Sequence, residues 1–175
     1  MPRTRPISFA ETAKYGILLG TAGGLAEVVW IAFYGSMTGT DTAEVARAVS
    51  AVVGSMLPGI SFAAAPVIFG VVLHMVIAVG IGIGLVLAWS AFTAHRPGRG
   101  NEYAFMVGAL AIIWAFNFFV LLPLISPTFV ELLPYPVSLT SKLLFGLAGA
   151  VAFRFGAGNR SKFMPLRVQA LRSGK

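Results

Sequence analysis

Four strongly polar residues lie inside otherwise apolar stretches of this chain, one residue in each stretch. They are Glu27, His74, Asn117 and Lys142. A carboxylate, an imidazole, an amide and an ammonium group can form ion pairs and hydrogen bonds, and the imidazole can change its charge near neutral pH. Burying a charge in an apolar medium is costly unless it is paired. These residues therefore predict buried partners, or a site for a ligand, ion or proton.

The stretches that hold these residues have the length of membrane-spanning helices. They cover approximately residues 13–35, 65–91, 103–124 and 137–155, and a helix needs about 20 residues to cross a bilayer core of about 30 Å. Of all 175 residues, 57% are hydrophobic and only 11% are charged, whereas roughly a quarter are charged in soluble domains. We therefore expect a single all-α domain, a polytopic membrane protein with four transmembrane helices.

The basic residues predict the orientation of these spans. Eleven of the 13 Lys and Arg residues flank one side, Arg47 alone lies on the other, and Lys142 lies within a span. Short loops that carry Lys and Arg stay in the cytoplasm. We therefore expect a multi-pass protein of the bacterial inner (plasma) membrane with both termini cytoplasmic. The eleven residues are Arg3, Arg5, Lys14, Arg96, Arg99, Arg154, Arg160, Lys162, Arg167, Arg172 and Lys175.

Both predicted outer loops contain helix signals. In the first loop, Asp41 and Glu44 resemble a capping box, and apolar residues then recur on one face of residues 41–56. This pattern predicts a short amphipathic helix on the outer membrane surface. In the second loop, residues 126–136 begin with Ser-Pro and close with two prolines, which predicts one or two helical turns. The apolar face of the first helix comprises Val45, Val49, Val52, Val53 and Met56.

The four polar residues are expected to lie in one layer in the outer half of the membrane. Counted from the nearest predicted boundary, they lie six to eight residues inside their spans, or about 9–12 Å at 1.5 Å per residue. Lys142 shares a helix face with Ser138 and several glycines, and Glu27 projects near a ridge of small residues. We expect these two faces to approach closely and Glu27 to pair with Lys142. If the layer only fixes the register of the helices, a His74 to Asn117 hydrogen bond is expected beside that pair. The ridge consists of Gly16, Gly20 and Gly24.

Several functions are compatible with such a layer. It can fix the register of the helices, form a small polar cavity open toward the outer face, or be completed by a partner subunit. The leading hypothesis is a non-enzymatic accessory subunit or small homo-oligomer. The alternatives are a small transporter or channel for an ion or proton, and a haem- or quinone-binding membrane protein. Haem would need a second axial ligand, because His95 lies at the opposite boundary from His74.

Other classes are disfavoured by what the sequence lacks. It has no cysteine, which excludes disulfides and thiolate metal sites, and it shows no paired acids, metal-ligand cluster or nucleophile beside a base. We therefore expect no enzyme, no cofactor and no metal site. The basic excess accompanies membrane spans and forms no basic helix, so nucleic acid is not an expected partner. The basic tail, residues 159–175, is expected to adhere to anionic lipid in the cytoplasmic leaflet.

Four segments carry a resemblance to known sequences: GLAEVVWIAFYG, TGTDTAEVARAVS, LHMVIAVGIGIGLVLAW and WAFNFFVLLPLISPTFVELLPYPVSLTSKLLFGLAG. They resemble uncharacterised small four-helix inner-membrane proteins of bacteria, of the domain-of-unknown-function type. The resemblance covers most of the chain and implies a polytopic membrane protein. It implies no established activity and assigns no catalytic residues.

Overall fold

The computed structural model describes residues 9–56, 66–95 and 101–158. The described part is helical and contains no strand, which confirms the all-α prediction. The basic tail, residues 159–175, lies outside the described residues. The elements are α1 (Phe9–Thr38), α2 (Thr42–Ser55), α3 (Val67–His95), α4 (Glu102–Phe116), the π-helical turn η1 (Asn117–Leu121), α5 (Leu122–Ile125), α6 (Pro127–Leu132) and α7 (Tyr135–Gly158).

Four helical segments are long and apolar enough to cross a membrane, namely Phe9–Thr38, Val67–Thr93, Glu102–Ile125 and Tyr135–Gly156. The third of these comprises α4, η1 and α5. Large apolar side chains cover the outside of the bundle; Val29, Val76 and Ile112, for example, are 66%, 63% and 72% exposed. Such a surface is stable only in contact with lipid. The chain is therefore a multi-pass membrane protein, as predicted.

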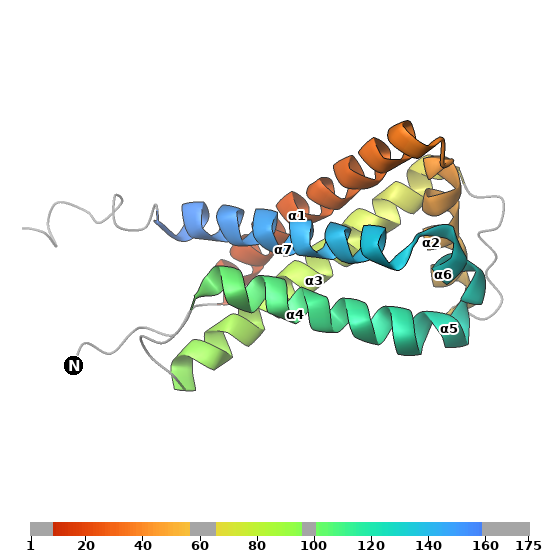
Figure 1. The fold of residues 1–175 in the computed structure, drawn as a ribbon. Coiled ribbons are helices and arrows are strands. Elements are labelled where there is room, and N and C mark those ends of the chain that lie inside the picture. The colour runs from red at the N-terminus through yellow and green to blue at the C-terminus, as the bar shows by residue number, and fades with distance from the viewer. Residues whose placement is uncertain (1–8, 57–65, 96–100, 159–175) are drawn as a thin grey trace, which may run out of the picture.

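The helices form an open bundle in which α1 and α7 are central (Figure 1). Helix α1 packs along α3 on one side and along α7 on the other, and α4 packs against α7. Helices α3 and α4 approach each other near the end of the bundle where α1 begins and α7 ends, here called the terminal end. Trp89 and Phe92 of α3 pack there against Phe105 of α4 in tilted arrangements, at ring-centroid distances of 5.2 and 5.5 Å. From that contact the two helices diverge toward the opposite end.

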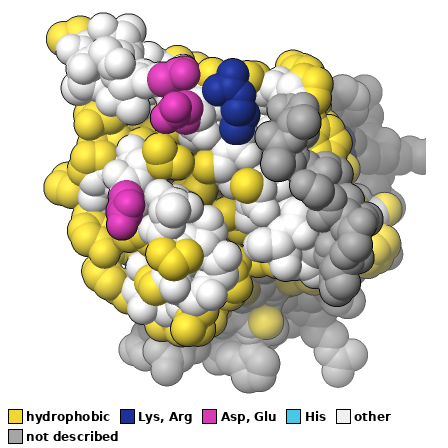
Figure 2. Space-filling model, turned by 90° about the vertical axis from the view of Figure 1, so that its right-hand side faces the viewer, with side chains coloured by type: hydrophobic (Ala, Val, Ile, Leu, Met, Phe, Trp, Pro, Cys, Tyr) yellow, Lys and Arg dark blue, Asp and Glu magenta, His cyan; other side chains and the backbone are white. Residues whose placement is uncertain are grey.

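The space between the diverging helices is covered by α2 and α6, which contact each other at what is here called the α2/α6 end. Figure 2 shows this end, where charged side chains are few among apolar and uncharged surface. Helix α2 begins where the carboxylate of Asp41 accepts a hydrogen bond from the Ala43 backbone N–H at 2.8 Å, a typical N-cap. Helix α6 starts at Pro127, as the Ser-Pro pair predicts, although Ser126 makes no side-chain capping bond.

Helix α2 packs on the bundle, whereas the sequence alone suggested that it lies on the membrane surface. A Cβ placed on Gly70 of α3 would collide with the Ala46 carbonyl group, and Ser50 is fully buried beside it. Val45 is buried as well, while Glu44 and Arg47 are exposed. The amphipathic pattern was therefore interpreted correctly as a helix, but its inner face contacts protein because Gly70 lets the two backbones approach.

The glycine ridge of α1 faces a different helix from the one predicted. Cβ atoms on Gly16 and Gly20 would collide with the backbone of α3, and one on Gly82 of α3 would collide with both glycines in return. Toward α7, by contrast, close packing pairs a glycine with a large side chain: Gly149 lies against Leu19. The ridge thus joins α1 to α3. Glu27 can still reach α7 because successive residues of a helix point about 100° apart.

Candidate functional site

Glu27 of α1 is the centre of the buried polar site. Its side chain is almost fully buried, and both carboxylate oxygens contact the Lys142 ammonium of α7, at 2.6 Å for Oε1 and 2.9 Å for Oε2. The Ser141 hydroxyl donates a further hydrogen bond to Oε1 at 3.0 Å. This pairing confirms the ion pair expected from the sequence. Pairing and hydrogen bonding together offset the cost of removing two charges from water.

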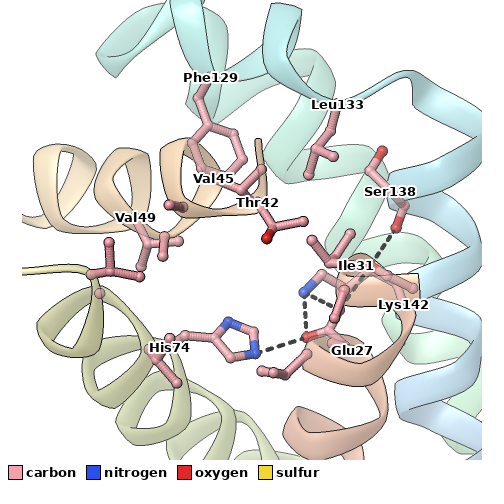
Figure 3. A pocket seen from close by; sticks show the side chains of 18 of the residues that line it. Glu27, Ile31, Thr42, Val45, Val49, His74, Phe129, Leu133, Ser138 and Lys142 are labelled. Atoms are coloured by element: carbon pink, nitrogen blue, oxygen red, sulfur yellow. Dashed lines mark hydrogen bonds and ion pairs between the residues drawn. The ribbon is translucent and has the colours of Figure 1, made fainter. Parts of the chain in front are cut away.

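His74 of α3 joins the pair from the opposite side. Its Nε2 lies 3.6 Å from Glu27 Oε2, close enough for an ion pair if the ring is protonated but longer than a hydrogen bond. Nε2 is buried without a hydrogen-bond partner. Figure 3 shows the imidazole lying along one side of an open space, with one ring nitrogen toward Glu27. Glu27, His74 and Lys142 therefore meet at one level of the bundle, as their depths predicted.

Asn117 does not join them. It is half-buried at the start of η1, forms no hydrogen bond to His74 and does not line the space beside the ion pair; its neighbour Phe118 lines that space. The predicted His74 to Asn117 hydrogen bond is therefore wrong. Depth along a helix follows from counting residues, but the direction of a side chain changes by about 100° at each residue. No pattern in this span fixed that direction.

Hydrogen bonds hold the first turns of α7 against the other helices. The Trp30 indole N–H donates to the Val137 carbonyl oxygen at 3.0 Å, and the Trp114 indole N–H donates to the Ser138 hydroxyl at 3.0 Å. The Ser141 hydroxyl also contacts the Ser138 carbonyl oxygen at 2.9 Å. Sequence reasoning missed Ser141, although a second serine three residues after Ser138 in an apolar span was an available signal. These bonds fix the height of Lys142 opposite Glu27.

A cavity of about 280 Å³ opens directly above the ion pair (Figure 3). Glu27, His74 and Lys142 lie at its floor, and apolar side chains form nearly all of its walls. The cover consists of α2, from which Val45 and Val49 project, together with Phe129 of α6 and Leu133, the residue that follows α6. The remaining wall residues include Val28, Ile31, Ala32, Val67, Val71 and Phe118.

The bundle is closed by apolar packing below the ion pair. Leu19, Val86, Leu110 and Phe145 are fully buried between the floor of the cavity and the terminal end. Among the described residues, the next buried side chains with a polar group in that direction on α1 are Tyr15 and Thr12, about three and four turns from Glu27. The cavity therefore opens on one side of the polar layer only.

No protein family, curated protein or solved structure matches this chain. The resemblance to small bacterial inner-membrane proteins thus stays a prediction.

The residues at the floor are suited to hydrogen bonding and poorly suited to holding a metal. The described residues contain no group of three or more His, Asp or Glu side chains placed to bind an ion. Glu27 and His74 supply two metal-ligating groups, but the Lys142 ammonium already occupies both oxygens of the carboxylate. A bound cation would have to displace it. What the site offers to a ligand is N–H donors beside an apolar chamber.

Proposed function

We propose that this chain is a non-enzymatic membrane protein that binds a small amphipathic molecule in the cavity between α1, α2, α3 and α7. The observation that carries the proposal is a chamber of about 280 Å³ with apolar walls and a floor made of Glu27, Lys142 and His74. Ligand sites in proteins typically combine an apolar lining with a few convergent polar groups, and range from about 300 to 1,000 Å³. The volume of the cavity lies just below that range.

We also propose that the protein lies in the bacterial inner membrane with both termini in the cytoplasm. The eleven basic residues on the side of the termini support a bacterial inner-membrane protein with cytoplasmic termini. The cavity, at the α2/α6 end, then faces the outer leaflet. A subunit of a larger complex or a small homo-oligomer could present the same cavity, and the basic tail would add contacts to anionic lipid.

The second candidate, a transporter or channel for an ion or proton, draws less support. A path through the bundle would have to pass the buried apolar residues Leu19, Leu110 and Phe145 below the ion pair. Among the described residues, no buried Ser, Thr, Asn, Gln or charged side chain lies between the ion pair and Tyr15 to replace the water around an ion. Haem draws little support as well, because His74 has no second histidine opposite it in the cavity lining.

The proposal is tested with a fluorescent probe and a matched pair of cavity variants. The neutral aromatic probe 1-aminoanthracene is titrated into protein in phosphatidylcholine nanodiscs, and we expect a saturable fluorescence increase. Val71→Phe places a larger side chain in the cavity and should weaken probe binding. Val72→Phe makes the same change at the neighbouring residue, which is 51% exposed toward lipid, and should retain it. Equal signals from the two variants, or no saturable signal from the unmodified protein, would refute a ligand-binding cavity.

A further inference from the structure

We propose that the ligand is an uncharged lipid-like molecule whose carbonyl-bearing head accepts a hydrogen bond from the Lys142 ammonium. Its hydrocarbon chain leaves the cavity sideways between α3 and η1. This inference rests on the proposed function and names the class of molecule that the cavity takes. Quinones with a hydrocarbon tail belong to this class.

The charge balance at the floor selects an uncharged head. The Glu27 carboxylate and the Lys142 ammonium neutralise each other at 2.6 Å, and Ser141 also donates to the carboxylate. The other described groups that line the cavity are neutral hydroxyls, apolar side chains and His74. A charged head would therefore bring an uncompensated charge into a chamber with apolar walls, which is costly. An uncharged head avoids that cost.

The hydrogen-bonding groups at the floor select a head that accepts. An ammonium group has three N–H donors and no acceptor, and the two oxygens of Glu27 do not use all three. Figure 3 shows the Lys142 ammonium and the His74 ring facing the same open space, with the Thr42 side chain across from them on α2. The carboxylate, the strongest acceptor nearby, is already occupied by Lys142 and Ser141. Carbonyl oxygens suit such a floor, because they accept hydrogen bonds without donating.

Aromatic side chains provide flat surfaces for a planar head. Phe118 of η1 and Phe129 of α6 both line the cavity, with ring centroids 6.5 Å apart and an interplanar angle of 62°. Aromatic rings associate with other planar rings in edge-to-face or offset arrangements. A conjugated carbonyl-bearing ring can therefore pack against these phenylalanines while its oxygens reach the floor.

The size and the position of the cavity place the rest of the molecule in the bilayer. A volume of about 280 Å³ accommodates a head and the beginning of a chain, but not a whole membrane lipid. Among the described residues, α3 makes no extended contact with η1 or α5, because α3 and α4 diverge from their contact at the terminal end. On the sides formed by α3 and η1 the cavity is lined by apolar residues, Val67 and Val71 on α3 and Phe118 on η1. A hydrocarbon chain that leaves the cavity on this side passes apolar side chains on its way to the lipid.

The inference is tested by displacement of 1-aminoanthracene with three amphiphiles that share a ten-carbon chain. These are decylubiquinone, which is uncharged and carries carbonyl groups, decanoate, which is anionic, and decylamine, which is cationic. At pH 7 in phosphatidylcholine nanodiscs, we expect decylubiquinone to displace the probe at a concentration at least tenfold lower than either charged amphiphile. Lys142→Met combined with Glu27→Gln keeps the floor uncharged and removes its ammonium donors. This double variant should bind decylubiquinone with an affinity at least tenfold lower than that of the unmodified protein.

Each outcome separates the ligand class from the proposed function. Equal displacement by all three amphiphiles, or stronger displacement by a charged one, overturns the inference while the cavity still binds the probe. Unchanged decylubiquinone affinity in the double variant overturns the role of Lys142. If that variant fails to fold, the comparison of the three amphiphiles on the unmodified protein and on Val72→Phe still shows whether the cavity prefers an uncharged head group. Failure of 1-aminoanthracene to bind in a Val71-dependent way refutes the proposed function itself.

Discussion

Glu27 is the residue on which the site depends. Its carboxylate connects α1 to α7 through Lys142 and Ser141 and approaches His74 of α3. Because the carboxylate is almost completely buried, it cannot exchange these partners for water. The same contacts that stabilise the bundle also orient the Lys142 ammonium beside the cavity, so structural and binding roles coincide in one group.

At this scale we expect Glu27 and Lys142 to be energetically coupled. Glu27→Gln or Lys142→Met alone leaves a buried charge without its partner and should lower the free energy of unfolding by about 3–5 kcal/mol. The double substitution should cost clearly less than the sum of the two. Thermal unfolding in detergent provides the measurement, and strict additivity would contradict the pair. Asn117→Leu is the control: it removes a polar group of the neighbouring span that forms no bond to the cluster and should change Tm far less.

At the scale of elements, glycines decide how closely the helices pack and thereby where the cavity forms. Helix α3 carries Gly80, Gly82 and Gly84 in alternation, and a Cβ on Gly82 would strike the backbone of α1. A Cβ on Gly80 or Gly84 would meet nothing within 4 Å. Of these three glycines, Gly82 alone is the one that lets α3 pack closely on α1.

Alanine substitutions of these glycines should have opposite effects. Gly82→Ala should lower the free energy of unfolding by about 1–3 kcal/mol, because the methyl group forces the two backbones apart. Gly80→Ala should leave stability unchanged or raise it by up to about 1 kcal/mol, since alanine favours helix more than glycine does. Thermal unfolding of both variants in the same detergent checks this. If both substitutions lowered the free energy of unfolding equally, Gly82 would not be the point of close contact between α1 and α3.

Helix α2 should be protected on one face by the bundle that it covers. The chain has no cysteine, so single cysteines can be introduced without background labelling. A membrane-impermeant maleimide should label cysteines at the exposed positions Arg47, Ala51 and Ser55 and react poorly at the buried positions Val45 and Ser50. Comparable rates at all five positions would mean that α2 does not pack on α3.

For the whole molecule, the side on which the cavity opens depends on how the bundle is inserted. Lys14 and Arg154 lie on the spans toward the terminal end, and Arg154 pairs there with Glu102 at 3.2 Å. Arg47 lies on α2 at the other end. Because loops rich in Lys and Arg stay in the cytoplasm, we expect the terminal end to be cytoplasmic and α2 and α6 to face the periplasm.

Reporter fusions check this orientation. Fusions after Gly39 and after Pro134 should report a periplasmic location, and fusions after Gly98 and after Lys175 a cytoplasmic one. All four fusions are needed to distinguish two alternatives. An inverted bundle would reverse all four reporter signals, whereas a missing span would reverse only the signals that follow it in the chain. A cytoplasmic signal after Gly39 and Pro134 would place the cavity on the cytoplasmic side.

The sequence by itself determined the spans, the start of α2 and the pairing of Glu27 with Lys142. These features depend on local quantities: the length of an apolar run, the capping preference of Asp41 and the rise along a helix. An unpaired charge in each of two spans also left few ways to satisfy either one.

Only the tertiary structure decided which helix faces pack together and where they part. The sequence assigned the glycine ridge of α1 to the last span, yet Gly16 and Gly20 pack on α3. It placed Asn117 in the polar site, yet Phe118 lines the cavity. The cavity arises because α3 and α4 diverge while α2 and α6 cover the space between them. Directions around a helix and crossings between helices depend on all contacts at once, so no single segment of the sequence contains them.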